Sequence, residues 1–341
     1  MIPNDRLRFH FLDVGHGDAT IIEFPDFGTP VPTPRFAVVD FGDWGTAELV
    51  RDYMTELVAA RTGNTMDGYS IEFVCVTHPH EDHFAGMRTF LDRFADAGSS
   101  SMNRVRQFWD CGFRTNSARY NNTLRTIITN RNMTFVRLSS GTEYEFGQVR
   151  VTVLAPSIDL RNRFDTFGVD KNNASIVLRL RLRNSYAVLA GDAEYESWGK
   201  IVEEFPRNRS VDYISDALGM AERDETTDQL KSDLLRASHH GSKHGTDLRY
   251  LERIDPNRIV ISAGDDLWYR SNEPGWIGMF PHPVTSLIMG ELDAAVPVHV
   301  TGETGHVVYS YSGGWSPAQP EFLRSDPGEP GFRQALEAAL V

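Results

Sequence analysis

Short apolar runs separated by polar, glycine-containing turns dominate the pattern of hydrophobic positions along this chain. Runs of about four to eight residues rich in β-branched and aromatic side chains are typical of strands. Stretches whose apolar residues recur every three to four positions are typical of amphipathic helices. Strands are expected at 7–14, 20–24, 36–41, 71–76, 105–110, 134–138, 149–154, 175–182, 186–190, 234–237, 258–262, 296–300 and 305–311. Helices are expected at 46–61, 83–95, 117–130, 194–205, 247–254 and 283–291.

The order of these elements begins as three strands and a helix and then becomes mixed. Arg183-Asn184-Ser185 lies between two apolar runs, which indicates a hairpin turn. Residues 313–331 are rich in proline and glycine and indicate a surface segment, with a short helix in the last ten residues. The pattern therefore predicts one α/β domain over residues 1–312, followed by a tail over residues 313–341.

Composition narrows the class of protein. The chain has 341 residues, of which 40% are hydrophobic, so a large core is expected. No run approaches the roughly 18 apolar residues that a membrane span requires, and no signal peptide is evident at the N-terminus. The two cysteines, Cys75 and Cys111, lie in or beside apolar runs, so no disulfide framework is expected. These features predict a cytoplasmic protein with no membrane partner.

Charge is unevenly distributed along the chain. The net charge of −13 argues against loose nucleic-acid binding, which depends on lysine and arginine contacts to phosphate. Residues 99–137 nevertheless hold seven arginines against one acid, a local balance of +6. Residues 212–233 hold seven acids against two basic residues, and they are interpreted as a lid, an insertion or a partner-binding loop.

Residues 77–83 read Thr-His-Pro-His-Glu-Asp-His and carry the main chemical signal. Three imidazoles and a carboxylate fall within six positions, directly after the apolar run 71–76. Ligands at the carboxyl end of a strand occupy the place where α/β sheets bind ions and substrates. Imidazole suits Zn²⁺, and carboxylate also suits Mn²⁺, so a metal site is predicted.

Later strand ends supply further candidate ligands. Asp192 follows the apolar run 186–190, the pair His239-His240 follows the run 234–237, and His282 lies in a Pro-His-Pro motif. A lone aspartate at such a place is more often a helix N-cap, and a lone histidine pair is more often structural. Their occurrence together with residues 78–83 favours metal ligation by Asp192 and by one histidine of the pair. For His282 ligation or catalysis and a structural role remain equal alternatives.

The order of motifs resembles the metallo-β-lactamase superfamily. It runs through Asp-Val-Gly-His-Gly-Asp at 13–18, the histidine cluster, Asn-Asn-Ala-Ser at 172–175, Ala-Gly-Asp at 190–192 and His-His-Gly-Ser at 239–242. The chain is most similar to the competence-type, ComEC-like branch. The resemblance implies an αββα four-layer sandwich with a dinuclear metal site at one edge.

The resemblance also implies roles for individual residues. His78 and His80 would hold one ion. The second ion would be held by Asp82, His83 and His240. The carboxylate of Asp192 would bridge the two ions. His239 is the alternative to His240. Asp40 would support the metal-binding loop, and Asp18 would lie near the active site. Asn172 and Ser175 would order a loop or contact substrate.

One departure from the superfamily pattern bears on the substrate. Many members carry a further histidine where this chain reads Asn172-Asn173-Ala174. The absence is shared with the competence-type branch and with related phosphocholine esterases, and it favours a phosphoester substrate. A first site with fewer nitrogen ligands admits Mn²⁺ beside Zn²⁺.

A mechanism and a function follow as expectations. Two divalent ions would generate a bridging hydroxide that attacks phosphorus, with Asp82 orienting it and Ser242 or His282 assisting. The predicted function is a phosphodiesterase or nuclease acting on nucleic acid or nucleotide phosphodiesters. Arginine beside the aromatics of 99–137 suits a phosphate backbone with stacked bases, although a solvated helix face and core aromatics explain them equally well. The alternatives are a hydrolase of a lactone, thioester or β-lactam, and a partner-gated module of a multi-protein system such as a defence system.

Overall fold

Two β-sheets form the framework of the protein. The computed structural model describes residues 4–26, 33–95, 104–129, 132–164, 169–206, 228–242, 244–245, 248–264, 296–312 and 319–341. The first sheet has the strand order β15 (Glu321–Leu323), β14 (His306–Tyr311), β1 (Leu7–Phe11), β2 (Thr20–Phe24), β3 (Arg35–Val39), β4 (Ser70–Val76), β5 (Val105–Asp110) and β6 (Thr134–Arg137). The second has the order β13 (Val298–Val300), β12 (Arg258–Ile261), β11 (Leu234–Arg236), β10 (Ser185–Leu189), β9 (Val177–Leu182), β8 (Val149–Ala155) and β7 (Glu143–Phe146).

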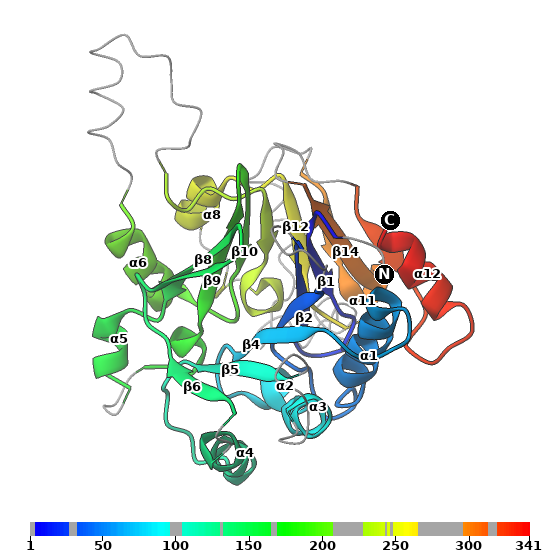
Figure 1. Ribbon diagram of the computed structural model, residues 1–341. Helices are drawn as coiled ribbons and strands as arrows, with labels where there is room; N and C mark the ends of the chain where they lie inside the picture. The colour runs from blue at the N-terminus through cyan, green and yellow to red at the C-terminus, as the bar shows by residue number, and fades with distance from the viewer. Residues whose placement is uncertain are drawn as a thin grey trace, which may run out of the picture.

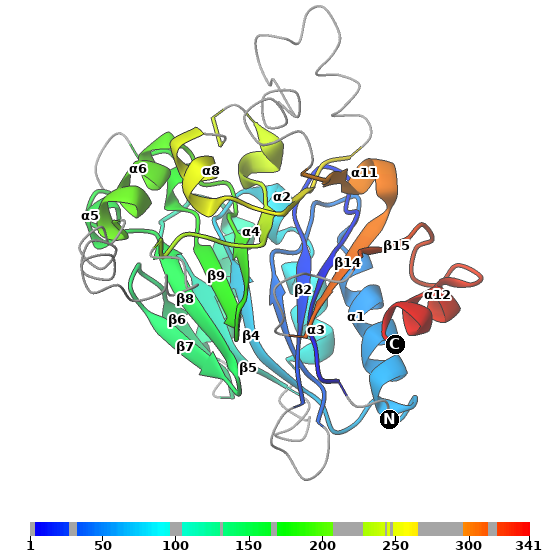
Figure 2. The same ribbon diagram turned by 90° about the horizontal axis from the view of Figure 1, so that it is seen from above.

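Each sheet is part antiparallel and part parallel. Strands β3 to β6 run parallel in the first sheet, as do β10 to β13 in the second. The predicted turn at Arg183 and Asn184 joins β9 and β10 into an antiparallel hairpin. Figures 1 and 2 show the two sheets face to face, with helices on both outer sides. This is the predicted αββα sandwich.

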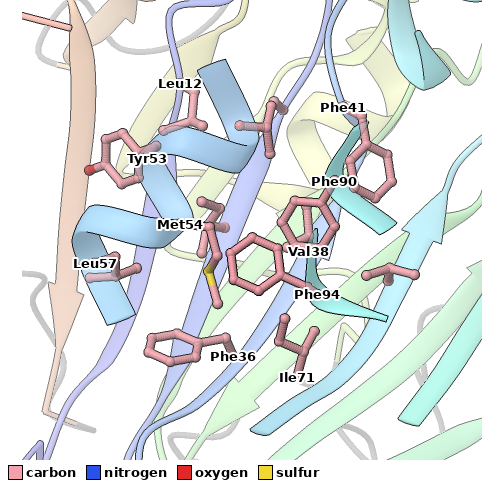
Figure 3. Packing of buried hydrophobic residues seen from close by; sticks show 14 of the residues in the cluster. Leu12, Phe36, Val38, Phe41, Tyr53, Met54, Leu57, Ile71, Phe90 and Phe94 are labelled. Atoms are coloured by element: carbon pink, nitrogen blue, oxygen red, sulfur yellow. The ribbon is translucent and has the colours of Figure 1, made fainter. Parts of the chain in front are cut away.

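Helices with one apolar face cover the outer sides. The first sheet is covered by α1 (Leu49–Thr62), α3 (Met87–Phe94), α4 (Ala118–Thr129) and α12 (Phe332–Ala339), and the second by α6 (Tyr195–Glu204) and α8 (Leu248–Ile254). In α3 the buried residues are Met87, Phe90, Leu91 and Phe94, a helical spacing of three and four. Figure 3 shows residues from α1 and α3 packed against the first sheet.

The short elements are α2 (Glu81–Phe84), α5 (Ile158–Asn162), α11 (Thr301–Thr304) and the 3₁₀ turns η1 (Asn172–Ala174) and η2 (Ser238–Gly241). A separate aromatic-rich core fills the space between the sheets, where Phe73 stacks on Trp109 with ring centroids 3.7 Å apart. Cys75 and Cys111 are both buried and free, so no disulfide joins them. None of the helices in the described ranges is long and apolar enough to span a membrane.

The C-terminal segment adds an edge strand and a helix to the first sheet. Within residues 319–341, β15 pairs with β14 at the edge of the first sheet, and α12 buries Phe332 and Leu336 against the core beside α1. The short helix expected in the last ten residues corresponds to α12. Residues 319–331 lie mostly at the surface, and only Leu323 of the three residues of β15 is buried. The proline- and glycine-rich composition did not reveal the pairing of β15 with β14.

A buried charge cluster joins α1 to the first sheet. Glu23 of β2 is fully buried and contacts Arg61 of α1, and its Oε2 lies 3.7 Å from Nη1 of Arg8 and 3.8 Å from Nε2 of His10. Burial alone would raise the pKa of Glu23, but Arg61, together with His10 and Arg8, outweighs it and lowers that pKa to about 2. The carboxylate is therefore the shared anion of two buried guanidinium groups at this junction.

We predict that Glu23→Gln lowers the free energy of unfolding by about 3–5 kcal/mol, because it leaves buried arginines without their anion. The folded-state pKa lies below the ordinary value of 4.5, so the contribution is complete above about pH 4.5 and is lost as pH falls to about 2. Urea unfolding at pH 7 and at pH 3 measures both effects, and the gap between wild type and variant should narrow at the lower pH. A gap that is absent at pH 7 would contradict the assignment.

Candidate metal centre

Parallel strands bring the candidate ligands to one edge of the sandwich. The pair β3–β4 lies in the first sheet and the pair β10–β11 in the second, and both pairs are parallel. The loop after β3 carries Asp40, the loop after β4 carries residues 78–83, and the loops after β10 and β11 carry Asp192 and His240. Carboxyl ends of neighbouring parallel strands lie at the same edge, so side chains distant in sequence meet there.

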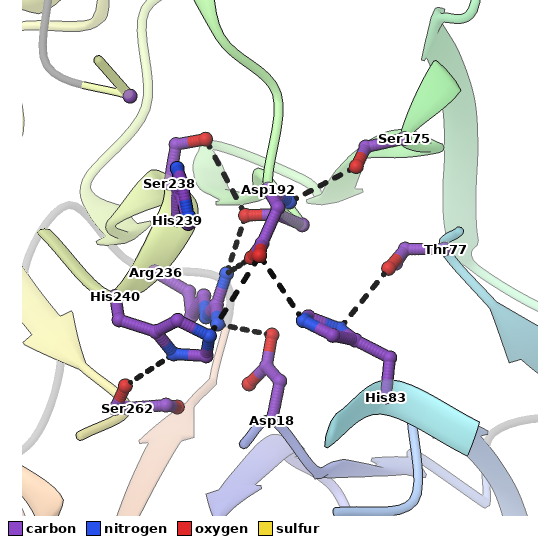
Figure 4. Close-up of polar contacts among 12 residues, drawn as sticks. Asp18, Thr77, His83, Ser175, Asp192, Arg236, Ser238, His239, His240 and Ser262 are labelled. Carbon is purple, nitrogen blue, oxygen red and sulfur yellow. Dashed lines mark hydrogen bonds and ion pairs between the residues drawn. The ribbon is translucent and has the colours of Figure 1, made fainter. Parts of the chain in front are cut away.

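Four of these side chains converge tightly. Asp82, His83, Asp192 and His240 each place one potential ligand atom so that all lie within 4.8 Å of one another. Oδ2 of Asp192 lies 3.2 Å from Nε2 of His83 and 3.7 Å from Nε2 of His240. Nε2 of His240 is also 3.3 Å from Oδ2 of Asp82. Figure 4 shows His83, Asp192 and His240 pointing toward one another from different elements.

The donor set fits a divalent cation. Nδ1 of His83 is engaged by Asp40 at 2.8 Å, while its buried Nε2 makes no hydrogen bond with the described residues. Nδ1 of His240 lies 2.7 Å from the carbonyl oxygen of Ser262, which leaves Nε2 directed at the cluster. A histidine that donates from one ring nitrogen to an oxygen presents the other nitrogen to a metal. Imidazole nitrogen with carboxylate oxygen suits Zn²⁺ and Mn²⁺.

Electrostatics show that this cluster requires positive charge. Burial alone would lower the pKa of His83, but the carboxylates of Asp192 and Asp40 outweigh it and hold that pKa well above its ordinary value. Burial likewise opposes the charge of Asp192, yet His83 and His240 hold its pKa well below the usual range. A proton on His83 thus balances the carboxylates where a cation would otherwise do so.

His78 and His80 lie beside this cluster on the side of Asp192. Nε2 of His78 is 3.8 Å from Oδ2 of Asp192 and 2.8 Å from Nδ1 of His80. His78 is fully buried, whereas His80 is half-buried. Burial and the charge of His83 hold the pKa of His78 well below its ordinary value, so its ring is neutral and able to ligate. That these two histidines and Asp192 hold a second cation stays a prediction.

Asp40 fixes the metal-binding loop. Its Oδ1 accepts a hydrogen bond from the backbone N–H of Thr77 at 2.8 Å, and its Oδ2 accepts from the Thr77 hydroxyl at 2.8 Å. The same Oδ2 lies 2.8 Å from Nδ1 of His83. Asp40 adopts a left-handed backbone with φ of 61°, a conformation that is costly for residues other than glycine. The carboxylate therefore orients His83 and the start of the loop together.

Asp18 reaches the centre through a residue that sequence reasoning missed. Arg236, only 1% exposed, forms an ion pair with Asp18, donates to the Gly191 carbonyl at 2.6 Å, and lies 3.8 Å from Oδ1 of Asp192. Arg236 stands at the end of the apolar strand β11, and a charged residue in such a short buried run is the signal that could have identified it. It ties the loop after β10 to the loop that carries Asp18.

The loop with Asp18 lies directly against the metal-binding loop. The N–H of Asp18 donates to the carbonyl of Asp82 at 3.1 Å, and a Cβ on Gly17 would stand 2.6 Å from that carbonyl oxygen. The glycine is thus required by close approach. His16, whose role was left open, lies on the exposed side with its Nε2 3.6 Å from Oδ2 of Asp82.

The remaining candidates surround the cluster without joining it. Nδ1 of His239 lies 3.0 Å from Glu194, and Nδ2 of Asn172 donates to the same carboxylate at 3.1 Å. The His239 ring is thereby directed at Glu194, whereas the His240 ring is directed at Asp82 and Asp192. Both histidines have positive φ values, 49° and 50°, and this left-handed turn sends adjacent rings in different directions.

The hydroxyls of two predicted serines, Ser175 and Ser242, accept hydrogen bonds from backbone N–H groups. The hydroxyl of Ser175 accepts a hydrogen bond from the N–H of Asp192 at 3.1 Å, which positions that aspartate. The hydroxyl of Ser242 accepts from the N–H of Gly245 at 3.1 Å, so it closes a turn after η2. His282 lies outside the described residues, and its predicted part in metal binding or catalysis stays a prediction.

We predict that Asp40→Asn weakens metal affinity by about 10–100-fold, because an amide cannot accept hydrogen bonds from Thr77 and His83 with both of its heavy atoms. Competition against a chromophoric chelator measures the affinity. Asp92→Asn, at an exposed carboxylate paired with Arg88 on α3, is the matched control and should leave affinity unchanged. Equal affinity in the two variants would show that Asp40 does not orient a ligand.

We also predict unequal effects of removing single histidines. His240→Ala should lose the more tightly bound ion, because His240 belongs to the buried four-residue cluster, while His80→Ala should lose the weaker one from the half-buried position. Elemental analysis after dialysis, with the melting temperature in parallel, measures this. A greater loss of metal and of thermal stability from His80→Ala than from His240→Ala would reverse the proposed order of the two positions.

Comparison with curated proteins gives one relative with a partial match. ComE operon protein 3 of Bacillus subtilis (strain 168) is 25% identical over 141 residues. The match covers 41% of this chain, and it spans only 14% of that protein's length. It agrees with the resemblance to the competence-type branch.

Solved structures of similar fold cover more of the chain at lower identity. The metallo-β-lactamase fold protein YhfI from Bacillus subtilis is 10% identical, with 89% of this chain and 99% of that chain covered and a TM-score of 0.48. CmlA, a diiron β-hydroxylase from Streptomyces venezuelae, is 11% identical; 77% of this chain and 45% of CmlA are covered, with a TM-score of 0.38. A diphosphatase from the PhnP family is 13% identical; 76% of this chain and 79% of the diphosphatase are covered, with a TM-score of 0.36.

The family model described as the metallo-beta-lactamase superfamily matches residues 35–264, the part of the chain that carries Asp40, the histidine cluster, Asp192 and His240. The match covers well over half of the chain. Together with the two-sheet sandwich and the convergence of these residues at its edge, it establishes that this chain belongs to the metallo-β-lactamase superfamily.

Proposed function

We propose that this protein is a metal-dependent phosphodiesterase that acts on nucleic acid or nucleotide phosphodiesters. Superfamily membership supports a metal-dependent hydrolase. The observation that favours a phosphodiester is a cationic pocket of about 540 Å³ beside the metal centre, lined by His80 together with Arg114 and Lys171. Guanidinium and ammonium groups next to the reacting centre recognise phosphate oxygens and balance charge that develops on them.

The ligand set would hold two divalent ions, Zn²⁺ or Mn²⁺. His78, His80 and Asp192 would hold one ion, and Asp82, His83 and His240 the other, with Asp192 shared. When bound, such ions supply Lewis acidity and an activated water as nucleophile. Burial would raise the pKa of Asp82, but His83 and His240 outweigh it and hold that pKa below the usual range. The ionised carboxylate is an acceptor only, and it would orient that water.

The chain's own residues would do the positioning. Asp40 holds His83, Ser175 holds the backbone of Asp192, and Arg236 ties Asp18 to the loop after β10. Arg114 and Lys171 would bind the non-bridging oxygens of the substrate. Protonation of the leaving oxygen is proposed for His282, whose ordinary pKa suits a general acid near neutral pH.

The residues that replace the further superfamily histidine weigh against a carbonyl substrate. Asn172 donates to Glu194, and Oδ1 of Asn173 accepts from the backbone N–H of Ser197 at 2.9 Å. Neither amide is directed into the metal cluster, so this loop adds no ligand to the ion proposed for His78, His80 and Asp192. The lactone, thioester and β-lactam alternatives therefore rank below the phosphodiester.

We predict that bis-p-nitrophenyl phosphate is hydrolysed with Mn²⁺ or Zn²⁺, and that Asp192→Ala loses activity by at least about 100-fold, since the shared ligand is removed. Release of p-nitrophenolate measures the rate, and labelled single- and double-stranded DNA and RNA identify the preferred polymer. Lys200→Gln, at an exposed ion pair on α6, is the control.

Two outcomes would overturn this proposal. Hydrolysis of a lactone, thioester or β-lactam without phosphodiester cleavage would move the protein to the carbonyl hydrolases. Two bound metals with no turnover of either class would favour a partner-gated module, in which a protein partner completes or opens the site.

A further inference from the structure

Two pockets that share Arg114 extend from the metal centre. The first begins at His80 and Lys171, and the second, of about 420 Å³, continues to Arg137 and Arg161. Arg114 follows β5, Arg137 ends β6 and Arg161 belongs to α5, three elements that lie next to one another (Figure 1). We refer to the two pockets together as the cationic track.

The cationic track is positively charged on a strongly acidic protein. Among the described residues, four cationic side chains line it, from Arg114, Arg137, Arg161 and Lys171, against the single acid Glu81. Arg137 and Arg161 both lie close enough to the buried carboxyl of Asp110 to favour its charged form, so one further acid, behind the pocket lining, offsets part of this charge. On a chain whose net charge is −13, such a local reversal indicates a site for an anion and not a general property of the surface.

Two aromatic rings accompany these charges. Phe108, Trp109 and Tyr120, the aromatics that the sequence also offered for stacking, are fully buried in the core. Phe113 is half-buried and lines the first pocket, and Phe164 lines the second. Their ring centroids are 5.2 Å apart, and both rings pack against the core between the sheets while part of each stays exposed in the pockets.

We propose that the cationic track binds single-stranded nucleic acid and leads one of its phosphodiesters to the metal centre. This inference rests on the proposed phosphodiesterase function and names its substrate class. Arg114, Arg137 and Arg161 would contact successive phosphates while a base lies against Phe113 or Phe164. Backbone contacts from arginine with stacking on aromatic rings are the general means of binding single strands without sequence preference.

The extent of the track selects a polymer over a small ester. None of the candidate metal ligands lines the second pocket, so only a substrate that continues beyond the cleaved phosphate contacts Arg137 and Arg161. Pockets of this size admit single nucleotide units, whereas a duplex keeps its bases paired inside and presents only its backbone. A phosphopeptide would bring one phosphate and leave most of the cations without an anion.

The test compares two substrates in the metal-loaded protein. The double variant Arg137→Gln/Arg161→Gln removes two arginines of the second pocket, which none of the candidate metal ligands lines. The control Arg125→Gln/Arg150→Gln removes the same charge from exposed sites on α4 and β8. Cleavage of a fluorescein-labelled 12-nucleotide strand, as DNA or RNA, gives KM. If the strand is not cleaved, its fluorescence anisotropy gives Kd. Bis-p-nitrophenyl phosphate reports the metal centre and the first pocket. Melting temperatures show that each variant is folded.

We expect the track variant to raise KM or Kd for the single strand about tenfold, and to reduce the slope of log affinity against log salt by roughly 1.4, since about 0.7 is lost per phosphate contact. Its activity on the small ester should stay within about twofold of wild type, and the control pair should change neither. An equal effect of both double variants, or no effect of either, would overturn the cationic track. If wild type cleaves neither substrate, the proposed activity fails, yet the comparison of Kd values still decides the track.

Discussion

Carboxylates buried side by side repel one another, and this repulsion is the constraint around which the site is built. Asp40, Asp82 and Asp192 all reach His83 within 4 Å, and the field of the carboxylates raises the pKa of its imidazole. Asp18 lies next to Asp40 and His83, and Arg236 forms an ion pair with it. A cation bound between these groups would replace the proton, so a metal centre is the arrangement in which each buried charge has a partner.

The two-sheet architecture holds these charges close together despite their repulsion. Each ligand-bearing loop follows a buried or mostly buried strand, β4, β10 or β11, so the backbone around the cluster is held by the sheets. Close approach of Gly17 to Asp82 and left-handed turns at Asp40 and His240 then aim the side chains. Such strained positions persist where the surrounding structure over-determines them, as at functional sites.

Charge acts here at two scales. The whole chain is acidic, which would discourage indiscriminate contact with nucleic acid, while the pockets that adjoin His80 are cationic. Anions would therefore be attracted mainly where they reach the metal centre. Of the seven arginines in 99–137, Arg114 and Arg137 face these pockets, whereas Arg119 lies over the ring of Trp44 and Arg106 pairs with Glu72. A run of like charges in sequence thus divides into separate roles in space.

From the sequence alone, apolar periodicity and local motif spacing predicted most strand positions and the residues that form the cluster, because both are properties of short segments, while the sandwich followed from the resemblance of the motif order to the superfamily. The sequence alone did not determine the place of β15 and α12, since β15 is defined by its pairing with β14 at the sheet edge, and α12 docks on α1, where Arg333 bonds to Glu56, 277 residues away. Nor did it separate His239 from His240, reveal the link from Arg236 to Asp18, or distinguish buried Trp109 from half-buried Phe113. Those outcomes depend on backbone direction at each residue and on which surfaces pack together, and only the tertiary structure decided them.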